Sequence, residues 1–246
     1  MAQTLEKRSY PFIAAIILGI SFILGMAIFG YFFYISKLPQ KTLSVTGSAR
    51  EFVISDIAEW SSNYSVKISE SKLNEGFRIM KIHEKKVLEI FREHGIKDDE
   101  LSLSAVSVSE LYTEPGQATE RQYVLTQYIT VQTKDVDGIA QKVKQITQQI
   151  LDLGVAFQAY SVEYYYSKLS EKRVQLLSSA VRDARRRAEE IAKSGGLTVG
   201  KVISARSGVV QVLAPNSVEV SDYGTYDTST KEKEVMVTVN VIFEAK

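Results

Sequence analysis

The chain has 246 residues, of which 45% are hydrophobic and 24% charged, a composition typical of a globular protein. Residues 1–41 hold four of its 30 basic residues and one of its 29 acidic residues, which leaves 26 basic and 28 acidic residues in the remainder. A domain so close to neutral lacks the basic surface of a nucleic-acid-binding protein, so we exclude that class. Cysteine is absent, which excludes disulfides, thiolate metal sites and cysteine nucleophiles.

An uncharged apolar stretch runs from Phe12 to Ile35, close to the N-terminus. About 24 residues at roughly 1.5 Å of rise each form a helix of about 36 Å, enough to cross the ~30 Å hydrocarbon core of a bilayer. Aromatic side chains, which favour the membrane interface, occur at both ends of the stretch. We therefore predict a transmembrane helix over residues 12–35 that contacts the lipid bilayer, with Phe12, Tyr31, Tyr34 and Ile35 as anchor residues.

A cleaved secretory signal peptide is the alternative for this stretch. The apolar region of a signal peptide runs for only about 7–15 residues and ends in small residues suited to cleavage. The stretch here is longer, and residues 31–37 contain no such site. We therefore favour an uncleaved signal anchor, with residues 1–11 as a short cytoplasmic tail and residues 36–41 as a linker.

The charges beside the predicted helix do not decide its orientation, because Lys7 and Arg8 precede it while Lys37 and Lys41 follow it. A long domain is translocated largely regardless of its charge, and here the long segment follows the helix. We therefore expect a single-pass membrane protein with its N-terminus inside and its C-terminal domain outside the cytoplasm.

Small residues recur at a spacing of four within the apolar stretch. The pairs are Ala15 with Gly19 and Ser21 with Gly25. Small residues at this spacing let two membrane helices approach closely, so these four are candidate helix-pairing residues. Because small residues are common in membrane helices in general, an ordinary lipid-facing role is the alternative.

The region after the linker alternates strands with helices. Alternation of apolar and polar residues, bounded by turn residues, predicts strands at 42–48, 60–69, 101–112, 121–133, 156–166, 199–210 and 235–243. Apolar residues three and four apart, followed by glycine or a turn, predict helices at 71–94, 137–153 and 170–194. Coiled coils share this spacing, but these helices are short and interleaved with strands. We predict one α+β domain over residues 42–246, with helices on one face of antiparallel sheets and the order β-β-α-β-β-α-β-α-β-β.

The predicted helix at 170–194 combines an apolar stripe with a dense basic run. The stripe consists of Val174, Leu177, Val181, Ala184, Ala188 and Ile191. The basic run consists of Arg182, Arg185, Arg186 and Arg187, a cluster that could bind anionic lipid or nucleic acid. Because Asp183, Glu189 and Glu190 each lie four residues from one of these arginines, we interpret the run as a solvated face that pairs with itself.

A segment of about twenty residues, 211–230, separates the last two predicted strands, and loops of this length are usually functional or disordered. Its apolar side chains argue against a purely solvated linker. We therefore predict a contact surface here, with Val212, Leu213, Tyr223 and Tyr226 as candidate assembly-interface residues.

Four tyrosines lie toward the end of the strand at 156–166, on both of its faces. They are Tyr160, Tyr164, Tyr165 and Tyr166. We predict that they pack on the core and on the faces of the sheet, with an interface to another molecule as the alternative, because tyrosine is enriched in both settings.

Two stretches of the domain carry a resemblance to a known family. The first is Leu43-Ser-Val-Thr-Gly-Ser-Ala49 followed by Ile54-Ser-Asp-Ile-Ala58, and the second is Ala180-Val-Arg-Asp-Ala-Arg-Arg-Arg-Ala-Glu-Glu-Ile-Ala192, which continues through Gly196-Leu-Thr-Val-Gly-Lys-Val202 to the valine-rich closing strand. With the order of elements, they make nearly all of residues 42–246 resemble the bacterial SIMPL-domain family, a group that includes periplasmic immunogenic and oxidative-stress-associated envelope proteins. Ser55 stands where the family usually has proline, and many members carry a cleaved signal peptide.

The resemblance implies an α+β fold, a site outside the cytoplasm and a tendency to form large homo-oligomers. With the predicted anchor, we expect the protein at the bacterial inner membrane. It implies no reaction, because the family has no established catalytic residues.

No residue pattern in the chain points to catalysis. The two histidines, His83 and His94, lie eleven residues apart on one predicted helix, which does not suit a zinc site, and we interpret both as surface residues. The chain also lacks the nucleophile-elbow, Walker A and dinucleotide-binding glycine motifs. We therefore predict no catalytic, cofactor-binding or metal-binding residues and no cofactor.

The sequence thus favours a non-enzymatic, membrane-anchored envelope protein that self-assembles into a large homo-oligomer, with a scaffold or structural role and an involvement in envelope stress. The alternative is a ligand-binding or chaperone-like module, which would need an open apolar cleft. A third class, an enzyme, would need a pocket with converging and strongly perturbed titratable groups. The sequence names no small-molecule ligand.

Overall fold

The computed structural model describes residues 9–37, 41–112, 120–217 and 221–246. Its helices are α1 (Ser9–Ser36), α2 (Leu73–Glu93), α3 (Ile139–Asp152) and α4 (Leu169–Ser194), with short 3₁₀ helices at Glu70–Lys72 and Asp98–Glu100. Its strands are β1 (Thr42–Ile54), β2 (Ile57–Ser69), β3 (Leu101–Leu103), β4 (Ser107–Leu111), β5 (Gln122–Thr133), β6 (Ala156–Tyr165), β7 (Val199–Leu213) and β8 (Glu232–Ala245).

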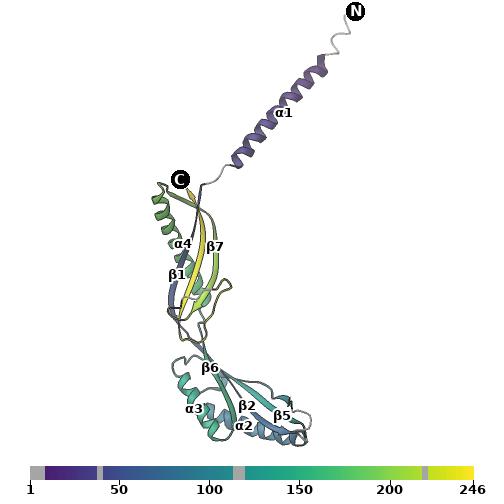
Figure 1. Cartoon of the computed structure of the whole chain (residues 1–246), viewed down its shortest axis with the longest axis vertical. Coiled ribbons are helices and arrows are strands. Elements are labelled where there is room, and N and C mark those ends of the chain that lie inside the picture. Colours follow the sequence, from purple (N-terminus) through teal and green to yellow (C-terminus); the bar gives the residue numbers. More distant parts are fainter. Residues whose placement is uncertain (1–8, 38–40, 113–119, 218–220) are drawn as a thin grey trace, which may run out of the picture.

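The predicted α+β class and the predicted order of elements are confirmed, except that the strand expected at 101–112 is interrupted and forms β3 and β4. Figure 1 shows α1 standing apart from the two sheets, which follow one another along the long axis of the molecule. We call the sheet next to α1 the proximal sheet and the other the distal sheet. Parts of the expected tail (1–11) and linker (36–41), and the expected loop at 114–116, lie outside the described residues.

The proximal sheet has the strand order β1-β8-β7, and all its pairs are antiparallel. β1 pairs with β8 without a register shift from Thr42 opposite Glu244 to Ile54 opposite Glu232. This pairing extends β1 six residues beyond its predicted end at Ser48. The first and last strands of the domain therefore share one sheet.

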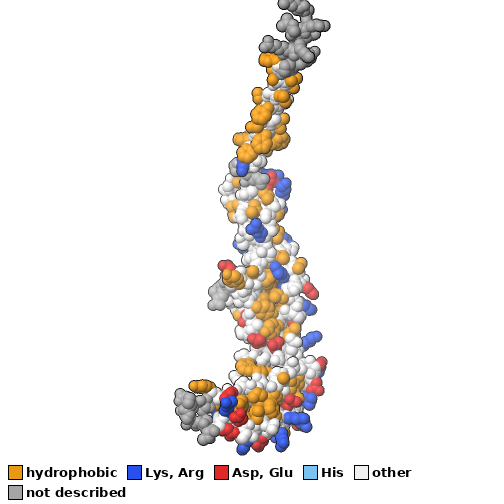
Figure 2. Space-filling view, turned by 90° about the vertical axis from the view of Figure 1, so that its right-hand side faces the viewer, with side chains coloured by type: hydrophobic (Ala, Val, Ile, Leu, Met, Phe, Trp, Pro, Cys, Tyr) orange, Lys and Arg blue, Asp and Glu red, His pale blue; other side chains and the backbone are white. Residues whose placement is uncertain are grey.

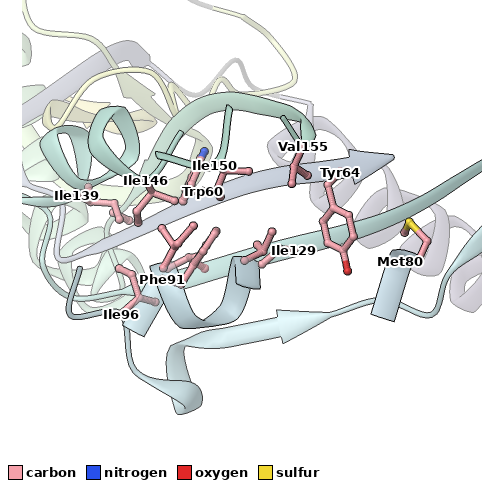
Figure 3. Packing of buried hydrophobic residues seen from close by; sticks show 14 of the residues in the cluster. Trp60, Tyr64, Met80, Phe91, Ile96, Ile129, Ile139, Ile146, Ile150 and Val155 are labelled. Atoms are coloured by element: carbon pink, nitrogen blue, oxygen red, sulfur yellow. The ribbon is translucent and has the colours of Figure 1, made fainter. Parts of the chain in front are cut away.

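The distal sheet has the strand order β3-β5-β2-β6, with β4 also paired to β5, and α2 and α3 pack on it. Its core is centred on Trp60, whose ring stacks on Phe91 of α2 at a centroid distance of 5.3 Å and meets Phe157 of β6 edge-on at 6.2 Å. Ile139, Ile146 and Ile150 of α3 lie beside this pair, and all three are fully buried (Figure 3). β1 and β2 thus follow each other in sequence but belong to different sheets.

α4 covers one face of the proximal sheet through a row of small side chains. The buried residues of this helix are Leu176, Ala180, Ala184, Ala188 and Ala192. The predicted stripe was wrong at both of its ends, because Val174 and Ile191 are 68% and 52% exposed. Residues spaced by four keep one face of a helix together, and alanine at each step lets the helix lie close to the strands.

Candidate functional site

The predicted anchor residues all lie on α1, where the side chains from Phe12 onward are exposed. Phe12, Tyr31, Tyr34 and Ile35 are between 44% and 70% exposed. Within the described residues, a 25-residue segment of this helix, Phe12–Ser36, is long and apolar enough to cross a membrane, and none of it is buried against the rest of the chain. Figure 2 shows its hydrophobic side chains as a continuous sleeve.

The four candidate helix-pairing residues lie on two different faces of α1. Each residue of an α-helix turns by about 100°, so Ala15 and Gly19 share one face while Ser21 and Gly25 lie about 120° away from it. A Cβ atom added at Gly19 or Gly25 would meet nothing within 4 Å. A single helix contact can therefore use one pair or the other, but not all four residues together.

The proximal and distal sheets are joined by two crossing segments and braced by a third. The β1–β2 connection passes through Ser55 and Asp56, and the β6–α4 connection runs through residues 166–168. Asp56 N donates to Tyr165 O at 3.0 Å, while its carboxylate accepts hydrogen bonds from Ser167 N at 2.7 Å and Ser167 Oγ at 2.6 Å. Burial raises the pKa of Asp56, but the bonds from Ser167 outweigh this and hold the pKa below its ordinary value. The two crossing segments are thus bonded to each other.

The third segment is residues 221–231, the part of the β7–β8 loop that reaches the distal sheet. Thr228 O accepts a hydrogen bond from Tyr164 N at 2.8 Å, and Lys231 O accepts one from Ser55 N at 3.0 Å. Tyr226 Oη accepts a hydrogen bond from Tyr166 N at 2.9 Å. A loop expected to meet another molecule is therefore bonded to β6 and to the β1–β2 connection of its own chain.

A buried cation lies at the centre of this loop. The side chain of Lys233 is fully buried, and its Nζ donates to Thr230 O at 2.7 Å and to Asp227 O. The same Nζ lies 3.6 Å from Asp227 Oδ2 and 5.7 Å from the centroid of the Tyr226 ring. Burial lowers the pKa of Lys233, and the neighbouring Asp227 opposes that shift only in part. Lys233 therefore bonds residues 227–230 of the loop to β8.

Asp227 is the partner that organises the loop backbone. Its carboxylate accepts hydrogen bonds from Ser229 N at 3.2 Å, from Ser229 Oγ at 2.6 Å and from Thr230 N at 3.1 Å. Burial raises the pKa of Asp227, but these hydrogen bonds outweigh it and hold the pKa at about 2. The carboxylate thus stays ionised beside the buried lysine.

The expectation that Val212 and Leu213 lie in the loop and form an assembly interface was wrong. Both belong to β7, where they are 1% and 3% exposed and are covered by the chain itself. Of the other two candidate interface residues, Tyr226 packs against Tyr165 at a ring distance of 5.9 Å, while Tyr223 is 96% exposed. Pairing of β7 with β8 continues to Leu213, which is why the strand extends past its predicted end.

Of the four tyrosines at the end of the strand predicted at 156–166, three lie in β6 and Tyr166 follows it, and all four have contacts within the chain. Tyr164 packs against the distal core, and Tyr166 packs against the cluster of the proximal core that contains Val53, Leu176, Val212, Val235 and Val237. Tyr165 donates to Glu163 at 2.7 Å, and this bond together with burial raises the pKa of Tyr165 to about 12. Tyr160 is 44% exposed and accepts a hydrogen bond from Asn63 at 3.1 Å.

The arginine face of α4 pairs mainly with itself. Arg187 lies 2.7 Å from Asp183, and Arg185 lies 3.0 Å from Glu189, as predicted. The third predicted pair was wrong, because Arg186 contacts Asp183 at 2.8 Å instead of Glu190. Arg182 donates to hydroxyls of the preceding turn.

Both histidines are half-buried, which corrects their interpretation as surface residues. The ring of His83 meets Tyr64 edge-on at 6.4 Å, and burial lowers the pKa of His83. His94 Nε2 lies 2.8 Å from Gln149 Oε1. In the part of the chain that the structure describes, no group of three or more histidine or carboxylate side chains could hold a metal ion.

The alternation of β8 indicates that the side chain of Lys233 faces inward, although a charged residue is usually expected at the surface. Residues 231–234 read as a solvated charge run, yet Lys233 has the same parity as the buried Val235 and Val237. Because alternate side chains of a strand share a face, this parity places Lys233 on the inward face of β8. Nothing in the local pattern named Asp227 as its partner.

The two stretches that carry the family resemblance contact each other in space. Ser48 N, in β1, donates to Asp183 Oδ2, in α4, at 3.0 Å. One residue earlier in β1, a Cβ atom added at Gly47 would meet the backbone of Ala180 and lie 2.7 Å from Ala184 Cβ. The residues that carry the resemblance thus include those that pack α4 against β1.

Comparison with known proteins places the chain in a family. No curated protein matches it. Among solved structures, the de novo designed protein Foldit4 is similar over 43% of this chain and 94% of its own, with 13% identity and a TM-score of 0.24, a likeness too small to carry an argument. A family model described as "SIMPL: Protein of unknown function (DUF541)" matches residues 43–243. The chain therefore belongs to the SIMPL (DUF541) family.

Proposed function

We propose that this chain is a non-enzymatic envelope protein that is anchored by α1 and self-assembles into a homo-oligomer, with a scaffold or structural role. One observation carries the self-assembly. Phe52 and Ile54 of β1 are 66% and 60% exposed, and both point away from α4, because Val53 between them is buried against that helix. Two large apolar side chains on one face of an outer strand favour contact with another surface.

The other side of this face is already covered. Met236 of β8 and Gln211 of β7 are buried, and Gln211 bonds to Ser221 at the start of the bracing loop. The chain thus covers the β7 side of the face and leaves Phe52 and Ile54 on the β1 side open. In Figure 2, hydrophobic side chains gather at mid-height of the molecule, where the two sheets meet.

The proposal places α1 in the bacterial inner membrane as an uncleaved signal anchor, with the N-terminus in the cytoplasm and both sheets outside it. Two observations support this placement. The apolar helix is longer than the apolar region of a signal peptide, and none of it is buried against the domain. Subunits that assemble would then bring their helices to one bilayer, where Ala15 with Gly19 or Ser21 with Gly25 offers a close contact.

A ligand-binding or chaperone-like module in envelope stress is the alternative function. It needs an apolar cleft, whereas Trp60, Phe91 and Phe243 fill the cores of the two sheets and are fully buried. The surface hollow of about 610 Å³ between β1 and α4 is lined by Ser44, Val45, Thr46, Arg186, Arg187, Glu190 and Ile191. Arginine and glutamate predominate on its α4 side. The hollow therefore favours a ligand-binding function only if the ligand is charged.

The molar mass of the full-length protein in detergent tests self-assembly. Multi-angle light scattering should give a mass several times that of the 27.5 kDa chain after the detergent contribution is subtracted. The double variant Phe52→Ser/Ile54→Ser should lower that mass, because it removes the apolar contact. The matched control Tyr112→Ser/Val174→Ser, at side chains that are 85% and 68% exposed elsewhere, should not. A monomer in the wild type, or an equal mass in both variants, would contradict the proposal.

A further inference from the structure

The end of the proximal sheet next to α1 gathers basic side chains. Lys41 directly precedes β1, Lys201 lies near the start of β7 and Lys246 directly follows β8, and all three are exposed. The three strand ends are bonded together, because Val199 pairs with Ala245 and Ala245 N donates to Lys41 O at 2.8 Å. Figure 2 shows blue side chains predominating over red ones at this end.

A surface hollow of about 610 Å³ lies among these strand ends. It is lined by Lys41, Lys201, Val202, Ile203, Glu244 and Ala245. The Glu244 carboxylate lies 3.5 Å from Lys246 Nζ, so this acid and one lysine offset each other and the other two lysines remain in excess. Val202 and Ile203 are 45% and 44% exposed. Mixed basic and apolar side chains at one surface are typical of contact with the headgroup region of a bilayer.

The tether from α1 keeps this end close to the membrane. Five residues, 37–41, separate the end of α1 from the start of β1. A fully extended chain spans at most about 3.6 Å per residue, so the start of β1 lies within roughly 20 Å of the end of α1. Lys37 lies at that helix end, with its Nζ 5.6 Å from the ring centroid of Phe33. No other end of the described domain is held so near the bilayer.

We propose that this basic end of the proximal sheet docks on the anionic phospholipid headgroups of the bilayer that α1 crosses. The inference rests on the membrane crossing in the proposed function. The attraction of the two lysines left in excess, at about 1 kcal/mol each, corresponds to roughly a thirtyfold preference for an anionic surface over a neutral one. Docking holds the long axis of the domain in a fixed orientation relative to the membrane.

Lysine acetylation of the full-length protein in lipid nanodiscs tests the docking. The protein is placed in discs of phosphatidylcholine alone or of phosphatidylcholine with phosphatidylglycerol, and mass spectrometry follows each lysine during brief acetylation. We expect Lys41, Lys201 and Lys246 to react roughly tenfold more slowly in the anionic discs, because the docked state dominates there. Lys81 and Lys85, exposed on α2 of the distal sheet, are matched controls and should react equally in both discs.

Salt and free phosphate separate the sources of protection. High salt should restore the reaction of the three lysines, because it screens an exposed charge contact. Equal reaction in both discs, or protection that salt leaves unchanged, would overturn the proposal. Protection by inorganic phosphate in neutral discs, equal to that in anionic discs, would also overturn it in favour of a free anion. Failure of the protein to enter either disc would show instead that the membrane crossing is wrong.

Discussion

Gly47 of β1 lies directly against Ala184 of α4, so closely that a Cβ atom at Gly47 would be 2.7 Å from Ala184 Cβ and would also meet the backbone of Ala180. Real Cβ atoms essentially never approach so closely, and a backbone cannot move aside as a flexible side chain can. Glycine at this position therefore sets the distance between α4 and the proximal sheet.

Replacing Gly47 should strain this contact. We expect Gly47→Ala to lower the free energy of unfolding by about 3 kcal/mol, because overpacking a well-filled core costs about 1–3 kcal/mol and the clash here includes backbone. Urea unfolding followed by circular dichroism measures the change. The control is Gly195→Ala at the end of α4, where an added Cβ finds only ordinary contacts, 3.6 Å or more, and the backbone φ is −93°. Equal stability of Gly47→Ala and wild type would show that α4 does not pack this closely.

Because Lys233 is buried, replacing its partner Asp227 should lower the stability of the fold more than replacing Lys233 itself. Asp227→Ala leaves a buried cation without its carboxylate, and breaking a buried pair in this way costs about 3–5 kcal/mol. Lys233→Met removes the fully buried charge itself and leaves Asp227, which is 18% exposed and keeps its hydrogen bonds from Ser229 and Thr230, so we expect it to cost less than Asp227→Ala. Lys231→Met is the matched control, because the pair that Lys231 forms with Asp137 is exposed and worth at most about 1 kcal/mol.

The same variants should separate the unfolding of the two sheets. Trp60 is the single tryptophan of the chain and lies in the distal core, so its fluorescence reports that core alone. In the wild type, we expect fluorescence and circular dichroism to change at the same urea concentration. In Asp227→Ala the two transitions should no longer coincide, because the brace between the sheets is lost. Coincident transitions in this variant would contradict the bracing role of the loop.

Protonation of Asp227 at acid pH should lower the free energy of unfolding. The pKa of Asp227 falls from the ordinary 3.8 to about 2 on folding, so its ionised form stabilises the fold above pH 3.8 and this contribution disappears as the pH falls through 2. The contribution is about 2 kcal/mol, since one pKa unit corresponds to about 1.4 kcal/mol. We expect the stability difference between wild type and Asp227→Asn to shrink over this range, as measured by urea unfolding at each pH. A difference that does not change with pH would contradict the assignment.

The orientation of the anchor can be read from single cysteines, because the chain has none of its own. Tyr223→Cys lies at a fully exposed position of the domain, and Gln3→Cys lies before the apolar helix. In spheroplasts, a membrane-impermeant maleimide should label Tyr223→Cys and leave Gln3→Cys unlabelled until the membrane is opened. The reverse pattern would place the domain in the cytoplasm.

Local patterns were sufficient to predict the apolar helix near the N-terminus and the order of elements. The length and apolar composition of Phe12–Ile35 predict a helix that could cross a membrane, and period-two alternation in a segment such as 60–69 depends on neighbouring residues only. The pairing of β1 with β8 joins residues almost two hundred positions apart, as in Thr42 opposite Glu244, and no local pattern specifies it. For this reason the sequence predicts antiparallel sheets but not which strands belong to each of them.

The site residues that the sequence places wrongly share a cause. Their burial depends on contacts between segments that are far apart in the chain, which a local pattern does not report. The predicted strand ends at residue 210, which places Val212 and Leu213 in the loop, whereas pairing with β8 keeps both residues in β7. The predicted stripe includes Ala184 and Ala188 but not Ala180, whose small size the close contact with Gly47 requires.

Particle images of the full-length protein in nanodiscs test the central proposal most directly. We expect several elongated domains on one face of each disc, standing on clustered helices, because the apolar face of β1 and the anchor favour assembly at one membrane. Discs that carry a single domain at every ratio of protein to lipid would contradict self-assembly.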